Sequence, residues 1–320
     1  MMLSIVVPVF NEERNVPELV NRLRQVLASA GIPFEVIFVD DGSTDRTAEI
    51  LAALHGEDDR IKAVHLARNF GHQAAISAGL RAAGGDAVVV MDGDLQDSPE
   101  TLPVFLERWQ AGYDVVYAVR EHRTESWPKR LGYRVFYRLL ARISQIDIPL
   151  DSGDFSLMSR SVVDVLNAMP ERTRFVRGMR SWAGFRQIGV PHRRGPRFAG
   201  EAKYTYRRLV RLAVDGFLSF SYRPLQLASL FGVVVSTLAL ALAIGLVVLK
   251  LTHGIPLVGW TSLMVAVLFM GGVQLICVGI LGEYVGRIYE ESRGRPPYLV
   301  ARVVGKTRLE ERAAGGPRTS

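Results

Sequence analysis

The sequence predicts an α/β protein with a mostly parallel sheet, joined to helices that lie on and in a membrane. From Leu3 to about Tyr117, short apolar segments alternate with segments of helical periodicity, and acidic residues follow several of the apolar segments. Two long stretches near the C-terminus carry no charged residue. Strands separated by helices favour a parallel sheet that is covered on both faces.

The elements follow one another in regular order. Short runs of β-branched and apolar residues predict strands at residues 3–9, 34–39, 61–66, 87–91 and 113–119. Helical spacing predicts a helix from Val16 to Ala30, which Gly31 closes, and another helix near residues 73–83. Ser43-Thr44-Asp45 can cap a helix that runs to about Leu54, and Pro99 opens a further helix.

The uncharged stretches predict a two-helix transmembrane hairpin. Residues 227–249 and 254–282 contain no charged side chain, and each stretch exceeds the ~20 residues that a helix needs to cross ~30 Å of hydrocarbon. We expect spans at about 227–249 and 258–281; a water-soluble core is a poor alternative. The basic residues flank the pair: Lys203, Arg207, Arg208, Arg211 and Arg223 before it, and Arg287, Arg293, Arg295 and Arg302 after it, with only Lys250 between. This bias predicts that both termini are cytoplasmic.

We therefore expect four regions. Residues 1–200 form a cytoplasmic α/β domain, 201–224 a juxtamembrane amphipathic helix, 225–285 the two spans, and 286–320 a cytoplasmic tail. Arginines recur beside apolar residues at 130–143 and again at 207–220, which is typical of helices at a membrane interface. A half-buried helix with a solvated arginine face remains open for both segments, more so for the first.

Composition excludes several classes of site. The net charge of +7 is concentrated near the spans, which favours anionic lipid over nucleic acid as the partner. Cys277 is the only cysteine, so an internal disulfide or a cysteine metal site is excluded. The chain has neither G-x-G-x-x-G after the first strand nor a P-loop, and an EF-hand loop starting at Asp92 would have Asp97 and Pro103 at its glycine and glutamate positions. The six histidines lack ligand spacing, so we interpret each as structural.

The strongest candidate for chemistry is Asp92-Gly93-Asp94, directly after the strand at 87–91. Ligands of open α/β sheets bind beyond the carboxyl ends of the strands. Mg²⁺ typically takes one or two carboxylates and completes its shell with phosphate oxygens and water. Glu12, Asp40 and Asp41 follow the first two strands, and their carboxylates could accept hydrogen bonds from a nucleoside. An acidic turn or helix caps are the alternatives when each cluster is taken alone.

Several motifs together resemble the inverting GT-A glycosyltransferases of family 2. They are Val7-Pro8-Val9-Phe10-Asn11-Glu12-Glu13, Asp40-Asp41-Gly42-Ser43-Thr44-Asp45 and Asp92-Gly93-Asp94-Leu95-Gln96-Asp97. Asp151-Ser152-Gly153-Asp154-Phe155 and Gly200-Glu201-Ala202-Lys203-Tyr204 are similar to the polyprenyl-phosphate branch, and Leu281 to Tyr289 is similar to its bacterial two-span members. The resemblance covers about Leu3 to Val300. It implies a GT-A, Rossmann-like fold and transfer of a sugar from a nucleotide sugar, UDP-glucose or another UDP-sugar, to undecaprenyl or another polyprenyl phosphate.

The resemblance also implies residue roles. Asp92 and Asp94 would hold Mg²⁺ or Mn²⁺ on the donor diphosphate; Asp94, Arg120 and Asp154 would be the catalytic residues, with Asp154 as a positioning group or a base. A loop carboxylate that caps backbone is the alternative for Asp154. The nucleotide-sugar site would contain Pro8, Phe10, Glu12, Val39, Asp40, Asp41, Asp92, Gly93 and Gln96, and phosphate would contact Arg120, Arg197 and Lys203.

Two departures from the family pattern stand out. Gly93 replaces an alanine, which we expect to expose backbone, and Ala202 replaces a serine or threonine, which removes a hydroxyl contact. The implied enzyme lies in the bacterial inner membrane with its catalytic domain in the cytoplasm. Its acceptor needs little general-base help, because a phosphate monoester has a second pKa of about 6 and is largely dianionic at neutral pH.

Other functions and assemblies stay open. A processive polysaccharide synthase is disfavoured because the chain has no Q-x-x-R-W segment and only two predicted spans; an inactive membrane scaffold is disfavoured by the intact acidic and basic motif residues. Gly272, Gly279 and Gly286 are spaced by seven residues, which would suit close helix approach in a homo-oligomer or glycines that face lipid.

Overall fold

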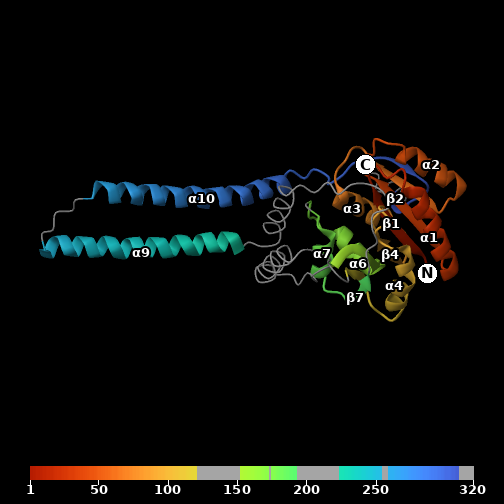
Figure 1. The fold of residues 1–320 in the computed structure, drawn as a ribbon, viewed down its shortest axis with the longest axis horizontal. Helices are drawn as coiled ribbons and strands as arrows, with labels where there is room; N and C mark the ends of the chain where they lie inside the picture. Colours follow the sequence, from red (N-terminus) through yellow and green to blue (C-terminus); the bar gives the residue numbers. More distant parts are fainter. Residues whose placement is uncertain (121–151, 173, 193–222, 254–258, 310–320) are drawn as a thin grey trace, which may run out of the picture. The chain divides into compact units, whose positions relative to one another are not determined.

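A computed structural model of the chain describes residues 1–120, 152–172, 174–192, 223–253 and 259–309 (Figure 1). The chain divides into two compact units, one containing residues 1–141, 146–203 and 296–320, and the other residues 142–145 and 204–295. The predicted amphipathic segments at 130–143 and 207–220 lie outside the described residues, as do Arg197, Ala202 and Lys203.

The first unit is built on a sheet of eight strands in the order β7-β5-β6-β4-β1-β2-β3-β8. The strands are β1 (Leu3–Val9), β2 (Phe34–Asp40), β3 (Ile61–Leu66), β4 (Ala87–Val90), β5 (Val115–Arg120), β6 (Ser152–Ser159), β7 (Gln187–His192) and β8 (Val300–Val304). The pairs β1–β2, β1–β4, β2–β3 and β5–β7 are parallel. The pairs β3–β8, β4–β6 and β5–β6 are antiparallel. The predicted α/β class with a mostly parallel sheet is confirmed.

Helices cover both faces of this sheet. The helices are α1 (Val16–Ala30), α2 (Thr47–Glu57), α3 (His72–Ala82), α4 (Leu102–Gln110), α6 (Arg160–Ala168) and α7 (Val176–Trp182), and a short 3₁₀ turn, Pro99–Thr101, precedes α4. Side chains of α1, α2 and α4 pack in one core cluster, whereas those of α3, α6 and α7 pack in the other. β1 contributes to both clusters, because successive residues point to opposite faces of a strand. This two-sided burial explains why its sequence, apart from Ser4, is apolar rather than alternating.

Several helices and strands begin or end where the sequence predicts. β1, α1 and β3 have the predicted bounds, and Gly31 closes α1 in a left-handed conformation with φ of 63°. Asp45 accepts hydrogen bonds from the backbone N–H and the hydroxyl group of Thr47, at 3.0 and 2.6 Å, where α2 begins. Of the predicted cap Ser43-Thr44-Asp45, it is thus Asp45 that binds the first turn.

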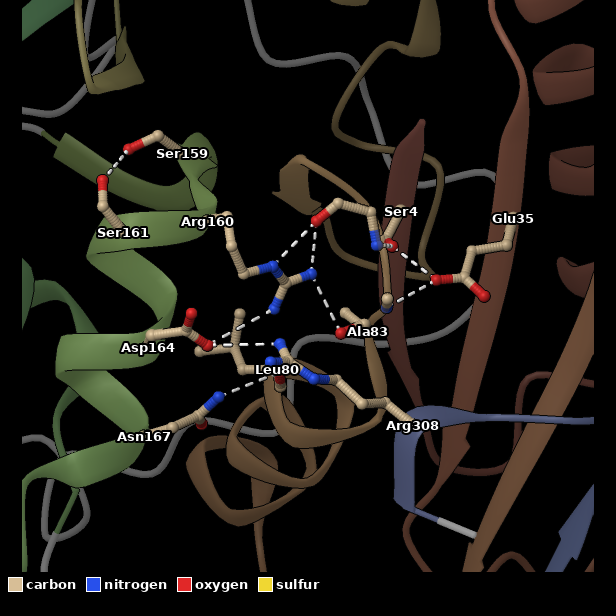
Figure 2. Close-up of polar contacts among 12 residues, drawn as sticks. Ser4, Glu35, Leu80, Ala83, Ser159, Arg160, Ser161, Asp164, Asn167 and Arg308 are labelled. Carbon is tan, nitrogen blue, oxygen red and sulfur yellow. Dashed lines mark hydrogen bonds and ion pairs between the residues drawn. The ribbon is translucent and has the colours of Figure 1, made fainter. Parts of the chain in front are cut away.

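The chain after residue 295 returns to the first unit. β8 pairs antiparallel with β3, and Tyr298 is buried in the core beside α3. In Figure 2, Asp164 of α6 lies between Arg160 and Arg308, with ion pairs of 3.8 and 3.2 Å. Arg160 also donates hydrogen bonds to the carbonyl oxygens of Ala83 and Gly85. The C-terminal segment is therefore part of the folded α/β unit.

The second unit contains two long helices that contact each other, α9 (Arg223–His253) and α10 (Trp260–Ser292) (Figure 1). Many of their large apolar side chains are exposed, for example Leu238, Leu275 and Ile276. Within the described residues, the segment Ser262–Ser292 is long and apolar enough to cross a membrane, and the shorter apolar stretch Leu230–Leu242 lies in α9. One candidate span is thus supported, and the two-helix transmembrane hairpin stays a prediction.

Candidate active site

Three neighbouring parallel strands bring the acidic motifs to one edge of the sheet. β4, β1 and β2 are adjacent, and they run in the same direction. Asp92 follows β4 by two residues, Phe10 and Glu12 follow β1, and Asp40 ends β2. Pro8 and Val39 lie opposite each other in the β1–β2 register. The nucleotide-sugar residues predicted from the sequence are therefore placed on one rim, at the carboxyl ends of the strands.

The loops after β1 and β2 are joined by hydrogen bonds. Asn11, in a left-handed conformation with φ of 57°, donates its N–H to the Ser43 hydroxyl at 2.9 Å, and its side-chain oxygen accepts the Thr44 N–H at 2.8 Å. The N–H of Glu12 donates to the Thr47 hydroxyl at 3.0 Å. These bonds fix the backbone directly after Phe10, and Phe10 itself is 44% exposed.

Asp40 and Asp41 are buried and already hydrogen-bonded. Asp40 contacts His65 Nδ1 at 2.9 Å and accepts the Ser43 N–H at 2.9 Å. Burial alone would raise the pKa of Asp40, but its bonds with His65 and Ser43 outweigh that effect and hold the pKa below its usual value. Asp41 accepts the N–H groups of Phe70 and Gly71 at 2.7 and 2.9 Å.

Burial raises the pKa of Asp41 despite these two bonds. Both carboxylates therefore stabilise the loops around the rim: Asp40 holds the turn after β2, and Asp41 holds the segment before α3. A direct contact of either carboxylate with a nucleoside stays a prediction.

The turn after β4 presents Asp92 and Asp94. Leu95 has a φ of 60°, and Asp94 accepts the N–H of Gln96 at 3.1 Å, so the carboxylate of Asp94 folds back on its own turn. Gly93 is buried, and a Cβ atom there would lie 2.8 Å from Cγ1 of Val9. The expectation that Gly93 exposes backbone is wrong: the turn packs directly on β1, and an added Cβ atom would force Val9 or the turn to shift.

The acidic turn fits a divalent cation held jointly with a substrate. The Asp92 and Asp94 side chains are partly exposed at the rim. Within the described residues, no group of three or more histidine, cysteine or acidic side chains is arranged to hold a metal. This donor set agrees with Mg²⁺ or Mn²⁺ sites, in which two carboxylates suffice when phosphate oxygens and water complete the shell. Asp92 and Asp94 are the residues that would hold the ion.

His72 connects Asp92 with Asp154. Its Nε2 atom lies 3.4 Å from Asp92 Oδ1 and 3.5 Å from Asp154 Oδ2. The strand register explains why Asp92 and Asp154 lie close together. Val90 of β4 pairs with Ser156 of antiparallel β6, so Asp92, two residues after Val90, lies level with Asp154, two residues before Ser156. Burial lowers the pKa of His72, but the attraction of both carboxylates is stronger and raises it.

Asp154 is surrounded by donors and cations. The Gln73 amide donates to Oδ2 at 3.1 Å, Arg177 Nε lies 3.5 Å from Oδ1, and the guanidinium of Arg180 is close enough to act on its charge. Burial alone would raise the pKa of this carboxyl group. Its interactions with His72 and the two arginines are stronger and hold the pKa far below the usual range. The donors and cations around Asp154 thus favour its ionised form.

The other predicted phosphate ligands are only partly described. Arg120 is the last residue of β5, but its side chain lies outside the described part of the structure, together with Arg197 and Lys203. Their roles stay predictions. Sequence reasoning did not single out Gln73, Arg177 and Arg180, and it interpreted His72 as structural like the other histidines. A basic residue pair spaced by three in Val176–Trp182 was the available signal, but nothing local indicates that it faces β6.

The chain is similar to known proteins along nearly its whole length. Residues 4–166 match the family model described as glycosyl transferase family 2. A bactoprenol glucosyl transferase of Shigella phage SfV is 42% identical over 301 residues, which cover 94% of this chain and 98% of that protein. A prophage bactoprenol glucosyl transferase homologue of Escherichia coli K12 is 40% identical over 304 residues, covering 95% and 99%.

An uncharacterized glycosyltransferase of Synechocystis sp. is 46% identical over 304 residues, which cover 95% of this chain and 96% of that protein. The matches run through the α/β unit and both long helices rather than through the sheet alone. The family model and these relatives show that this chain is a member of glycosyltransferase family 2 and a glycosyltransferase enzyme.

Proposed function

We propose that the protein transfers a sugar, with inversion, from a nucleotide sugar to undecaprenyl phosphate or another polyprenyl phosphate. UDP-glucose is the proposed donor, and the product is a lipid-phosphate-linked monosaccharide that serves modification of the cell envelope. The single observation that carries the proposal is the rim after β4, where His72 brings Asp154 next to Asp92 of the acidic turn. Near full-length similarity to proteins named bactoprenol glucosyl transferase supports the lipid acceptor.

The chemistry requires charge neutralisation more than proton removal. A phosphate monoester is largely dianionic at neutral pH, so its oxygen can attack the anomeric carbon without first losing a proton. The ionised Asp154 agrees with this, because a carboxyl group with so low a pKa is poorly suited to be a base. A divalent ion held by Asp92 and Asp94 would stabilise the charge that develops on the leaving diphosphate. Arg120, Arg197 and Lys203 are proposed to reduce repulsion between the two phosphorylated substrates.

The long helices are proposed to anchor the enzyme in the bacterial inner membrane. Their exposed apolar side chains are unfavourable in water and suit a lipid environment. Basic residues on both flanks of the helix pair support a topology with two spans and with the catalytic unit and both termini in the cytoplasm. A polyprenyl phosphate whose phosphate group lies at the inner leaflet would then react with a nucleotide sugar from the cytoplasm.

The proposal is tested with purified full-length protein, undecaprenyl phosphate, and Mg²⁺ or Mn²⁺. A panel of nucleotide sugars, including UDP-glucose, UDP-N-acetylhexosamines and a UDP-aminopentose, is supplied one at a time, and the lipid extract is analysed by mass spectrometry. We expect one sugar residue per lipid phosphate from a single preferred donor. A polymeric product would indicate a processive synthase, and absence of product from every donor would indicate an inactive scaffold.

A further inference from the structure

Gln73 joins three elements around Asp154. Its Nε2 group donates to Asp154 Oδ2 at 3.1 Å, and its Oε1 atom accepts the N–H of Val176 at 2.9 Å, where α7 begins. One amide group of α3 therefore fixes both a carboxylate of β6 and the start of α7. Asp154 Oδ1 is buried and, within the described residues, makes no hydrogen bond; it faces Arg177 Nε at 3.5 Å.

Arg180 is a buried cation behind this carboxylate. Its side chain is 1% exposed, and its Nε and Nη2 atoms make no hydrogen bond within the described part of the chain. Its guanidinium lies 5.0 Å from the centre of the Tyr117 ring, which provides partial compensation. Burial lowers the pKa of Arg180 to about 10, against the opposing attraction of Asp154, so the group remains charged at neutral pH.

A second buried arginine has backbone partners for two of its three guanidinium nitrogens. Arg174 is 8% exposed, and it donates to the carbonyl oxygens of Leu166 and Met169 at the end of α6, at 2.5 and 3.2 Å. Within the described residues, Nε and Nη2 of Arg180 have no such partner, and the attraction of Asp154 is the main interaction that favours its charged form. Burying a charge without full hydrogen bonding is expensive, which favours a functional reason for Arg180.

We propose that Gln73, Arg177 and Arg180 are positioning residues that hold Asp154 as the hydrogen-bond acceptor for a hydroxyl group of the donor sugar. This inference rests on the proposed function, because it assumes a nucleotide-sugar donor with its diphosphate at Asp92 and Asp94. His72 contacts both Asp92 and Asp154, so a sugar attached to that diphosphate lies close to Asp154. An ionised carboxylate accepts a hydroxyl hydrogen bond more strongly than a neutral acceptor does.

An acceptor for a sugar hydroxyl group contributes to binding and orientation, whereas a base contributes by removing a proton. A positioned carboxylate selects the sugar and orients the anomeric carbon, whereas the nucleoside and diphosphate bind elsewhere on the rim. Loss of a hydrogen bond to a charged group weakens binding by roughly tenfold to a hundredfold. That loss should be confined to ligands that carry the sugar, which separates this role from a general structural one.

The test compares two ligands on the same protein. Full-length protein in lipid nanodiscs is titrated by calorimetry with UDP and with UDP-glucose, each with Mn²⁺. We expect Asp154→Asn, Gln73→Ala and Arg180→Met to raise the Kd for UDP-glucose about tenfold or more and to leave the Kd for UDP within twofold. Gln73→Ala should add nothing in the Asp154→Asn background, because both changes remove one function.

Matched controls come from the same fold. Asn167→Ala removes an amide of α6 that donates to the Leu80 carbonyl of α3 (Figure 2), and Arg174→Met removes a second buried arginine. Both should leave the two Kd values within twofold of the wild-type protein. If Arg180→Met lowers the melting temperature so far that the protein unfolds, Arg180→Lys keeps the charge, and we expect it to retain most UDP-glucose affinity.

The outcomes are distinguishable. Equal loss of UDP and UDP-glucose affinity in Gln73→Ala, or no loss of either, would overturn the positioning role while glucose transfer by the wild-type protein still supports the proposed function. If the wild-type protein neither binds UDP-glucose nor transfers a sugar from any donor in the panel, the proposed function itself fails.

Discussion

Replacing Gly42 by alanine should damage the donor site, and Gly31 provides a matched control. Both glycines are left-handed, with φ of 72° and 63°. An L-residue in that region costs roughly 1–2 kcal/mol. A Cβ atom at Gly42 would in addition lie 2.6 Å from the Arg68 carbonyl carbon and 2.7 Å from the Asn69 nitrogen, whereas at Gly31 nothing lies within 4 Å.

The cost of the left-handed backbone conformation and the cost of the close backbone contact can be separated by their size. Overpacking against backbone costs about 1–3 kcal/mol, so we expect about 2–5 kcal/mol for Gly42→Ala and about 1–2 kcal/mol for Gly31→Ala. For a folding unit of roughly 150–250 residues, 1 kcal/mol corresponds to about 2–4 °C in melting temperature. Differential scanning fluorimetry of the two variants measures the shifts.

Activity provides the second half of this test. Gly42 lies between Asp41, which holds the segment before α3, and Ser43, which donates to Asp40. The Gly42→Ala variant should therefore also raise the KM for the donor severalfold, whereas Gly31→Ala should not. Equal melting shifts and an unchanged KM in both variants would refute the view that the β2 turn packs tightly against residues 68–69.

Three further predictions concern other parts of the α/β unit. Gly93→Ala should lower stability by about 1–3 kcal/mol through its contact with Cγ1 of Val9, and Val9→Ala should partly rescue it; no rescue in thermal unfolding would disprove the contact. The hydrogen bond with Arg22 lowers the pKa of Glu100 to about 2 from 4.5, so its contribution is present above pH 4.5 and is lost as pH falls through about 2. The difference in stability between wild type and Glu100→Gln should shrink over that range, and a constant difference would contradict it. Tyr298→Ala should destabilise the α/β unit by about 3–5 kcal/mol, because the ring fills the core beside α3; an unchanged melting temperature would show that the C-terminal segment docks only loosely.

Local patterns predicted the elements that a single stretch of chain determines. The strand at Leu3–Val9 and the helix at Val16–Ala30 have strong apolar signals and a glycine end, and both have the predicted bounds. β6 and β8 were not predicted, because their place in the sheet depends on partners far away in the chain. β8 is a short edge strand whose apolar run is interrupted by Arg302 and whose residues are exposed or half-exposed.

The candidate site shows the same division. The acidic residues after β1, β2 and β4 could be assigned to one rim because parallel neighbours end on the same side of a sheet. The sequence could not show that Asp40 and Asp41 face backbone and histidine partners, since those partners come from β3 and the segment before α3. The cluster around Asp154 could not be predicted from the sequence, because it depends on the antiparallel register of β4 with β6.

The central claim is that Asp92 and Asp94 hold a divalent ion through which the enzyme presents a nucleotide sugar to a phosphorylated lipid. The most direct measurement is the initial rate of labelled glucose transfer from UDP-glucose to undecaprenyl phosphate, in nanodiscs with Mn²⁺, for wild type and Asp94→Ala. We predict that transfer by the wild type is abolished by EDTA and restored by added Mn²⁺, and that Asp94→Ala inserts into nanodiscs normally but transfers nothing at any Mn²⁺ concentration. Wild-type rates from Asp94→Ala, or full activity in EDTA, would contradict the claim.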